Sequence, residues 1–529
     1  MFRGGSTLAG SFSDSIPLPL AMSWRHTAAY AAAASYNPAS PAIVDGVVYM
    51  TSGNRIVAVD AVTGALKWRY PQDETMASAV RTAPAVSDGL VIFGSAEGKM
   101  YAVDVQTRRL AWTFDSQSSI TASPTVADGV VYFGTADGRL WALAVRTGVQ
   151  VTAWKGGVRA PDELAGTPAV SNGVVYVLTT DQMLYGIAAS TAKTRTSVRL
   201  ESSVVRQCPI VRGELVYVAA GPMVMCLRAS NLGARRWARS LPADVAVAPV
   251  VSEGGVYVVS SEGRIYALDP LTGRPKWKTF PQLDLDVVAP PVVSGSTLIV
   301  GTVQGGLYGY DAETGALKWT YIIAASTTDP QSVMRYTNVS AAPVVSDGRV
   351  YVFTDDASVS CFSASAVDTT VPTVTELEPE PGIVINGNPP IHFRARLSDY
   401  GSGLNVDTIR LFLDDEPILK KTPADSQGET KPGFTFDRMD SLLEYDSPTT
   451  AAAAAQRNLP DGRHVMRLLA SDWKGNTVER LWSFSVDNTL KKLIGGRARL
   501  PRDTGGYGYT GRPGAGGGRG PSGSMGSDY

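Results

Sequence analysis

One pattern recurs along most of this chain and limits what it can fold into: a proline, an apolar run, a glycine turn and a tyrosine-bearing strand. The repeats begin at Pro41, Pro84, Pro124, Pro168, Pro209, Pro249, Pro291 and Pro343. A period of roughly 40 residues with several short strands is typical of a β-propeller, because one blade cannot bury its own faces. The sequence therefore predicts an all-β chain built on an eight-bladed β-propeller.

The individual repeats carry strand and hairpin signals. Val130–Thr135 and Val174–Thr179 alternate in the way expected of half-buried strands. Dipeptides such as Asp88-Gly89 precede these strands, and they readily adopt the positive φ of a tight hairpin. We interpret the recurring glycines as structural.

The two ends of the repeat region complement each other. The last copy stops at Val359–Ser365 without the Thr-Gly and the tryptophan that close other copies, whereas Trp24 stands alone before the first copy. Pairing a strand from the opposite terminus removes an open sheet edge. We therefore expect Trp24 to complete blade eight of a propeller that spans residues 21–366, and we expect residues 1–20 to be flexible.

Most repeats end in Ala-x-Asp-x-x-Thr-Gly-x-x-x-Trp, as in Ala58–Trp68 and Ala267–Trp277. This unit resembles the tryptophan-docking motif of the pyrroloquinoline-quinone (PQQ) type propellers, which include quinoprotein alcohol dehydrogenases and BamB, a subunit of the outer-membrane β-barrel assembly machinery. The resemblance implies that each indole wedges between neighbouring blades, where small residues leave room for it. The expected docking residues are Trp24, Trp68, Trp112, Trp154, Trp237, Trp277 and Trp319.

Blades three to five depart most from the consensus, whereas blade six reads as a regular copy. Blade four has no tryptophan, Trp141 replaces the usual tyrosine in blade three, and a charged turn follows at Lys155–Glu163. Such departures indicate either drift or a surface shaped for a partner. On the second interpretation, the candidate partner-binding residues are Arg159, Asp162 and Glu163.

A different domain follows the repeats. Residues 367–382 are rich in Pro and Glu and read as a linker, and residues 383–490 contain alternating strands that predict an immunoglobulin-like sandwich. The turns at Ser398–Leu404 and Ala470–Asn476 resemble those of bacterial immunoglobulin-like domains, and no cysteine is present to form the usual disulfide. Residues 491–529 are rich in Gly and Arg and are predicted to be disordered.

Composition excludes several partners. The formal net charge is -1 and charged residues make up 18% of the chain, so we expect no nucleic-acid binding by the folded domains. No apolar run is long enough for a membrane span, and the first residues contain no apolar signal core and no lipobox cysteine. BamB-type propellers and bacterial immunoglobulin-like domains are found in exported proteins. Their combination therefore favours the cell envelope, either periplasm or cell surface; a cytoplasmic location is the alternative.

Motifs for chemistry are missing from the sequence. The three cysteines, Cys208, Cys226 and Cys361, stand where other repeats have small buried residues, and the PQQ enzymes' adjacent cysteine pair is absent. No nucleophile elbow, P-loop or His-Glu-x-x-His occurs. We therefore predict no catalytic, metal-binding or cofactor-binding residues and no cofactor. The hypothesis is a non-catalytic scaffold that binds proteins in the manner of BamB; the alternatives are a quinoprotein dehydrogenase and a surface sensor or adhesion protein.

Overall fold

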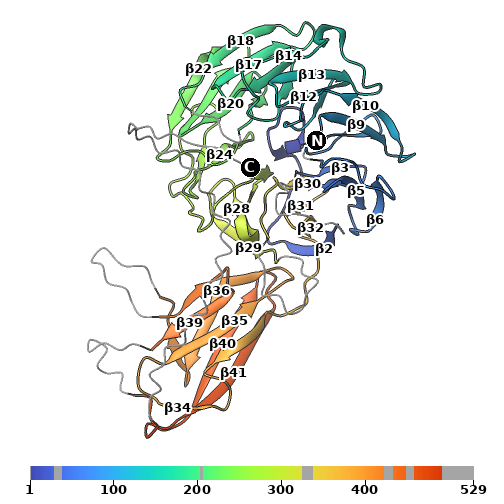
Figure 1. Cartoon of the computed structure of the whole chain (residues 1–529). Coiled ribbons are helices and arrows are strands. Elements are labelled where there is room, and N and C mark those ends of the chain that lie inside the picture. Colours follow the sequence, from blue (N-terminus) through green and yellow to red (C-terminus); the bar gives the residue numbers. More distant parts are fainter. Residues whose placement is uncertain are drawn as a thin grey trace, which may run out of the picture.

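The structure is a computed structural model that describes residues 2–28, 39–80, 82–202, 207–324, 337–421, 433–447 and 458–490. It shows two all-β units, a ring of eight sheets and a sandwich attached at one side of the ring (Figure 1). The predicted disordered tail, residues 491–529, lies outside the described residues. The described part of the chain contains no helix long and apolar enough to cross a membrane.

Blades one to five are four-stranded antiparallel sheets, each made from one repeat. Blades one and two contain β3 (Ala42–Val44), β4 (Val47–Ser52), β5 (Arg55–Asp60), β6 (Leu66–Tyr70), β7 (Ala85–Ser87), β8 (Leu90–Gly94), β9 (Lys99–Asp104) and β10 (Leu110–Asp115). Blades three and four contain β11 (Thr125–Ala127), β12 (Val130–Gly134), β13 (Arg139–Ala144), β14 (Val158–Arg159), β15 (Ala169–Ser171), β16 (Val174–Leu178), β17 (Met183–Ala188) and β18 (Thr194–Arg199). Blade five contains β19 (Ile210–Arg212), β20 (Leu215–Ala220), β21 (Met223–Arg228) and β22 (Asn231–Ser240). The short 3-10 helix η2 (Thr152–Trp154) precedes β14.

Blade six is less regular than its sequence indicates. Only β23 (Val250–Val251), β24 (Val256–Val259) and β25 (Ile265–Leu268) form its sheet. The segment that would be the fourth strand makes single bridges to β25 and its neighbourhood, one of them at Pro275, because proline has no N–H to donate to a ladder. Blade six thus keeps the full sequence motif but forms a sheet of three strands.

Blades seven and eight each include a strand from the start of the chain. In blade seven, β1 (Ser11–Phe12) lies parallel to β26 (Val292–Ser294), which is followed by β27 (Thr297–Gly301), the 3-10 helix η3 (Val303–Gly305), β28 (Gly306–Asp311) and β29 (Leu317–Ile322). In blade eight, β30 (Val344–Ser346), β31 (Arg349–Phe353) and β32 (Ser358–Ser363) are completed by β2 (Ala21–Thr27). Trp24 is paired with Cys361 in this ladder, so the predicted closure is confirmed.

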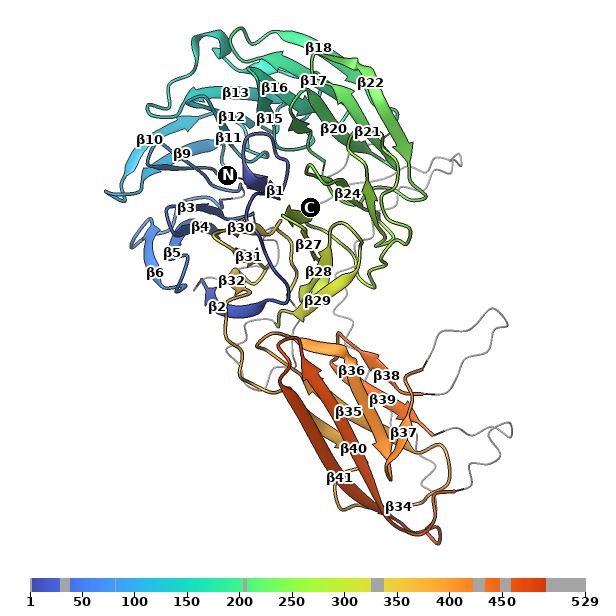
Figure 2. The ribbon, with the colours of Figure 1, turned by 180° about the vertical axis from the view of Figure 1, so that it is seen from behind.

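The structure differs from the expectation that residues 1–20 are flexible. Residues 2–20 run through the centre of the ring before reaching β2, and Figure 2 shows β1 in that position. The 3-10 helix η1 (Phe2–Gly4) starts this path. Leu8, Ile16 and Leu20 are buried along it, and burial of such side chains holds a segment that has no repeat of its own.

The sandwich is formed by two facing sheets. The first has the order β33-β35-β39-β38, and the second has the order β34-β41-β40-β36-β37. The strands are β33 (Thr373–Glu378), β34 (Val384–Ile385), β35 (His392–Ser398), β36 (Leu404–Leu413), β37 (Glu416–Ile418), β38 (Thr435–Asp437), β39 (Leu442–Asp446), β40 (Gly462–Asp472) and β41 (Thr477–Val486). Because β33 lies inside the segment expected to be a linker, the sandwich begins earlier than residue 383.

Candidate functional site: the central channel and the domain junction

The N-terminal segment hydrogen-bonds to the innermost strands of four consecutive blades. Backbone N–H groups of these strands donate to its carbonyls, from Val170 to Ser6 at 2.7 Å, Val211 to Thr7 at 2.9 Å, Val251 to Ala9 at 2.9 Å and Val293 to Gly10 at 3.1 Å. One carbonyl is thus used by each of blades four, five, six and seven. The segment follows the channel wall in an arc around the propeller axis.

Two side chains anchor this segment. Leu8 is 1% exposed and packs in a cluster that includes Cys208 and Ala248. Arg3 is 2% exposed; its guanidinium donates to the Sγ of Cys208 at 3.2 Å and to the carbonyl oxygen of Pro249. Among the residues that the structure describes, the Nε of Arg3 has no partner and no carboxylate forms an ion pair with this side chain. A buried cation therefore lies against the inner edges of blades five and six, in a place that the protein itself fills.

The predicted docking tryptophans lie between blades. In five of them the indole N–H donates to a backbone carbonyl of the next blade. The acceptor is the residue directly after the position of the motif aspartate. These bonds join Trp24 to Ala61, Trp112 to Val145, Trp154 to Ala189, Trp237 to Pro270 and Trp277 to Ala312. Trp68 is 9% exposed and packs against the ring of Tyr49.

The motif glycine is required by this contact. At Gly64, which has a φ of 71°, an added Cβ would lie 2.5 Å from the ring of Trp24. In blade four, which has no tryptophan, the equivalent position is Thr196, and its hydroxyl accepts the N–H of Leu232 at 2.9 Å. A short polar contact thus replaces the indole between blades four and five.

The recurring aspartates hold hairpin turns. One carboxylate oxygen of Asp60 accepts the N–H groups of Val62 and Thr63 and the hydroxyl of Thr63. The backbone hydrogen bond from Thr63, together with the bond from Lys67, lowers the pKa of Asp60 to about 2. A carboxylate that stays ionised and fully bonded stabilises its turn and is poorly suited to act as a base.

Trp319 packs against Phe362 of blade eight, but its indole N–H bonds to the sandwich instead of to the next blade. Its indole N–H donates to the carbonyl of Ser402 at 2.9 Å, and the neighbouring Tyr321 hydroxyl donates to the carbonyl of Tyr400 at 2.8 Å. Both acceptors belong to the turn before β36, which the sequence had marked as typical of immunoglobulin-like domains. This turn of the sandwich thus takes the place of the equivalent blade-eight carbonyl, that of Ala364.

The second turn singled out in the sequence also contacts the propeller. The indole N–H of Trp473 lies 3.3 Å from the hydroxyl of Thr320, and the Nζ of Lys474 donates to the carbonyl of Ala364 at 2.7 Å. The two turns together attach the sandwich to blades seven and eight.

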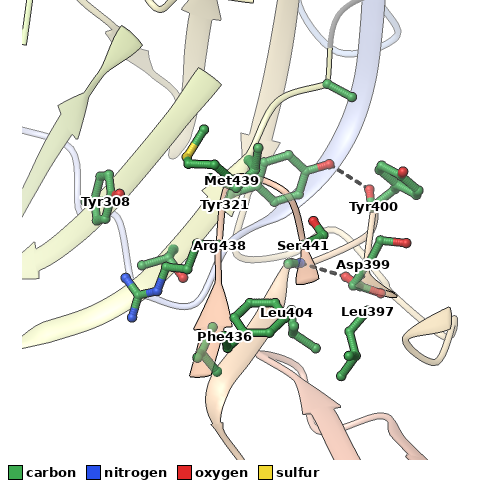
Figure 3. Close-up of a pocket in the computed structure, with 16 residues that line it drawn as sticks. Tyr308, Tyr321, Leu397, Asp399, Tyr400, Leu404, Phe436, Arg438, Met439 and Ser441 are labelled. Atoms are coloured by element: carbon green, nitrogen blue, oxygen red, sulfur yellow. Dashed lines mark hydrogen bonds between the residues drawn. The ribbon is translucent and has the colours of Figure 1, made fainter. Parts of the chain in front are cut away.

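A pocket of about 60 Å³ lies at this junction (Figure 3). Tyr321 and Tyr400 border it on one side, Leu404 and Phe436 form its floor, and Arg438 lies at one end near Tyr308. It is smaller than the roughly 150 Å³ cavity that accommodates benzene. We interpret this space as part of the joint between the domains.

Three carboxylates meet beside the pocket. Ligand atoms of Asp368, Asp399 and Asp472 lie within 4.8 Å of one another. Burial, followed by the negative charges of the other two groups, raises the pKa of Asp399 to about 6, against the hydrogen bonds from Gly403 and Gly401 that favour its ionised form. Oxygen ligands of this kind could hold a hard cation such as calcium. Their carboxylates already accept hydrogen bonds from nearby N–H groups, which accounts for the cluster without a metal.

The candidate partner-binding residues lie on the connection from blade three to blade four. Arg159 belongs to β14 and is paired with Arg139, whereas Asp162 and Glu163 follow in the loop that leads to β15. All three side chains are exposed. The structure places them on one loop and leaves their proposed role as a prediction.

The cysteines and His26 have structural surroundings. Burial raises the pKa of Cys226 to about 11 and that of Cys361 to about 12, so both thiols stay protonated and unreactive at neutral pH. Cys208 is buried and accepts a hydrogen bond from Arg3. His26 contacts the carbonyl of Gly64 through Nδ1 at 2.9 Å, and burial lowers its pKa.

Sequence reasoning missed the channel segment and the docking of Trp319 on the sandwich. Residues 1–12 carry no repeat pattern that could have indicated their strand partners. No sequence signal set Trp319 apart, because blade four also lacks the Thr-Gly and its Ala189 carbonyl still accepts the indole N–H of Trp154.

The fold and the channel define an eight-bladed β-propeller protein in which the N-terminus lines the axis and a β-sandwich completes the last docking contact. The family described as "Outer membrane protein assembly factor BamB" matches residues 21–155, 151–226 and 209–384. The chain belongs to this family.

Solved structures of low identity share the fold. BamB from Moraxella catarrhalis aligns with a TM-score of 0.53 and 15% identity, covering 67% of this chain and 100% of that one. A europium-containing methanol dehydrogenase aligns with a TM-score of 0.52 and 13% identity, covering 66% of this chain and 88% of that one.

Curated relatives match only a short part of the chain. The dehydrogenase subunit of a quinone-dependent alcohol dehydrogenase from Gluconacetobacter polyoxogenes is 33% identical over 85 residues, which is 15% of this chain and 12% of that relative. The chain thus matches about an eighth of that enzyme's length.

Proposed function

We propose that this protein is a non-catalytic scaffold of the cell envelope that binds other proteins, in the manner of the BamB-type assembly factor. Membership of the BamB family supports this function and the envelope location. The exposed loop that carries Arg159, Asp162 and Glu163 is the proposed partner-binding surface.

The observation that carries this proposal is the occupied channel wall of blades four to seven. The resemblance to quinoproteins implies a cofactor, a base and a calcium site near the axis. Here the backbone of residues 6–10 and the buried guanidinium of Arg3 lie along the channel wall. Calcium needs oxygen ligands such as carboxylates, and proton abstraction needs a base. Arg3 is a cation with no carboxylate beside it, so these residues do not fit a quinone and calcium site.

The second candidate function is a quinoprotein dehydrogenase, which the short matches to quinone-dependent alcohol dehydrogenases favour. Calorimetry with added PQQ and calcium separates the two candidates. We expect no tight complex and no alcohol-dependent reduction of a dye. Binding at micromolar concentration or tighter would favour the enzyme over the scaffold.

Reversing charges on the proposed surface tests partner binding. In the variant Arg159→Glu, Asp162→Lys, Glu163→Lys we expect loss of the proteins captured by the purified wild-type chain from an envelope extract. The melting temperature should stay unchanged, because surface charges away from packed groups contribute little to stability.

The matched control lies on the loop after blade six. Lys278, Asp284 and Asp286 are also one basic and two acidic exposed residues. Reversing these three charges should leave capture unchanged. Equal losses in both variants would mean that the blade-three loop is not special and that its departure from the consensus is drift.

A further inference from the structure

We propose that the channel wall formed by β3, β7 and β11, in blades one to three, binds an extended polypeptide segment of a partner protein through backbone hydrogen bonds. This inference rests on the proposed scaffold function and names the kind of ligand that one of its surfaces takes. The wall lies apart from blades four to seven, which the chain's own N-terminus occupies.

The register of the innermost hairpins shows which N–H groups face the channel. Two-residue turns join Val44 to Val47 in blade one and Arg212 to Leu215 in blade five. The pair that flanks such a turn exchanges hydrogen bonds, and the next pair along does not. The N–H groups of Ile43 and Val211 therefore point away from their own sheets and into the channel.

One half of the ring shows what these donors do. In blades four to seven the equivalent N–H groups, including that of Val211, donate to carbonyls of residues 6–10. In blades one to three the equivalents are Ile43, Val86 and Val126, and no hydrogen bond from them to the N-terminal segment exists within the described residues. The blade-eight strand β30 lies beside η1 and is left out of the proposed site.

Burial follows this division at blades one and two but not at blade three. The side chains of Val211 and Val251 are 1% and 0% exposed and those of Ile43 and Val86 are partly exposed, whereas Val126 is 5% exposed. Backbone N–H groups that face the channel without a protein acceptor can pair with a ligand that supplies carbonyl oxygens.

The bound N-terminus indicates the chemistry of that ligand. It supplies roughly one carbonyl per blade. A ligand that supplies one carbonyl to each of three neighbouring blades must be a continuous polypeptide backbone. Its residues are small around a single leucine, Leu8, because the backbone lies close to the wall; a Cβ on Gly10 would approach a Val250 methyl group at 3.0 Å. The expected partner segment is rich in Gly, Ser and Ala, with one apolar side chain at its centre.

The probe is a synthetic peptide with the sequence of residues 4–12, GGSTLAGSF, added to the full-length chain labelled with ¹⁵N-valine. We expect the amide resonances of Val86 and Val126 to shift during the titration, while those of Val211 and Val251 stay in place. Hydrogen exchange without peptide should be faster at the first two amides, because they lack the acceptor that protects the other two.

Proline substitutions remove single N–H groups at positions where the strand edge tolerates proline. The double variant Val86→Pro, Val126→Pro should bind the peptide at least about tenfold more weakly, because each hydrogen bond contributes a few-fold to affinity. The matched control Val211→Pro removes an N–H that the chain's own Thr7 uses. It should lower the melting temperature and leave peptide affinity unchanged.

Two results would overturn the proposal. Shifts at Val211 and Val251, or loss of binding in Val211→Pro, would mean that the peptide displaces the native N-terminus. An absence of shifts with peptide at about 5 mM, where even weak complexes are populated, would mean that the wall is not a site. If the peptide fails while charge reversal on the blade-three loop abolishes capture, the scaffold function stands and only this inference falls.

Discussion

The closure of the ring provides the sharpest test of the fold. Blade eight is held together by two segments that are far apart in sequence, with Trp24 of β2 docked on blade one. In Trp24→Ala the indole would be lost from above Gly64, along with its hydrogen bond to Ala61 at 3.2 Å. The Ala61 carbonyl would keep one donor, the hydroxyl of Tyr351 at 3.0 Å.

The magnitude follows from burial. Truncating a fully buried tryptophan costs about 3–5 kcal/mol, and the Trp24 side chain is only partly buried. Since no carbonyl is left unsatisfied, we expect a loss of about 2–3 kcal/mol in the free energy of unfolding, measured by urea denaturation.

The strands in which amide exchange accelerates distinguish a loss of ring closure from a general loss of core packing. Amide exchange in the β2–β32 ladder should accelerate by about 30- to 150-fold, the equivalent of 2–3 kcal/mol. Trp112→Ala is the control, because its indole docks between blades two and three, away from the closure. It should lower stability without accelerating exchange in β2. If Trp24→Ala changes neither stability nor exchange, the reasoning about closure is refuted.

Two further predictions concern the domain junction. Because the folded-state pKa of Asp399 is raised to about 6, this group makes the free energy of unfolding fall as the pH rises from about 4 to about 6. We therefore expect Asp399→Asn to raise the free energy of unfolding, relative to the wild type, by about 1 kcal/mol more at pH 7 than at pH 4, a value reduced for solvent screening. A difference between variant and wild type that is the same at both pH values would contradict this. Protease should cut the exposed stretch around Val367, yet the two fragments should elute together because Trp319 and Tyr321 bridge them. Trp319→Ala should let the fragments separate, whereas Trp112→Ala should not; fragments of the wild type that separate unaided would show that the junction is weak.

Local, periodic features of the sequence were sufficient for much of this fold. The recurring proline and the docking motif gave the number of blades, because each blade repeats the same short-range hairpins. The unfinished last repeat and the isolated Trp24 gave the closure, because a sheet edge and its missing strand are complementary. The exposed loop at Arg159 could be read from charge alone, and its role remains a prediction.

Only the tertiary structure decided how the non-repeating segments are used. The N-terminus finds its hydrogen-bond donors on four blades that are distant in sequence, and nothing in residues 1–12 encodes them locally. Likewise, Trp319 reaches Ser402 in another domain because the ring places blade seven beside a turn of the sandwich. The repeat determines which groups each blade exposes, whereas the three-dimensional closure of the ring determines which segments meet them.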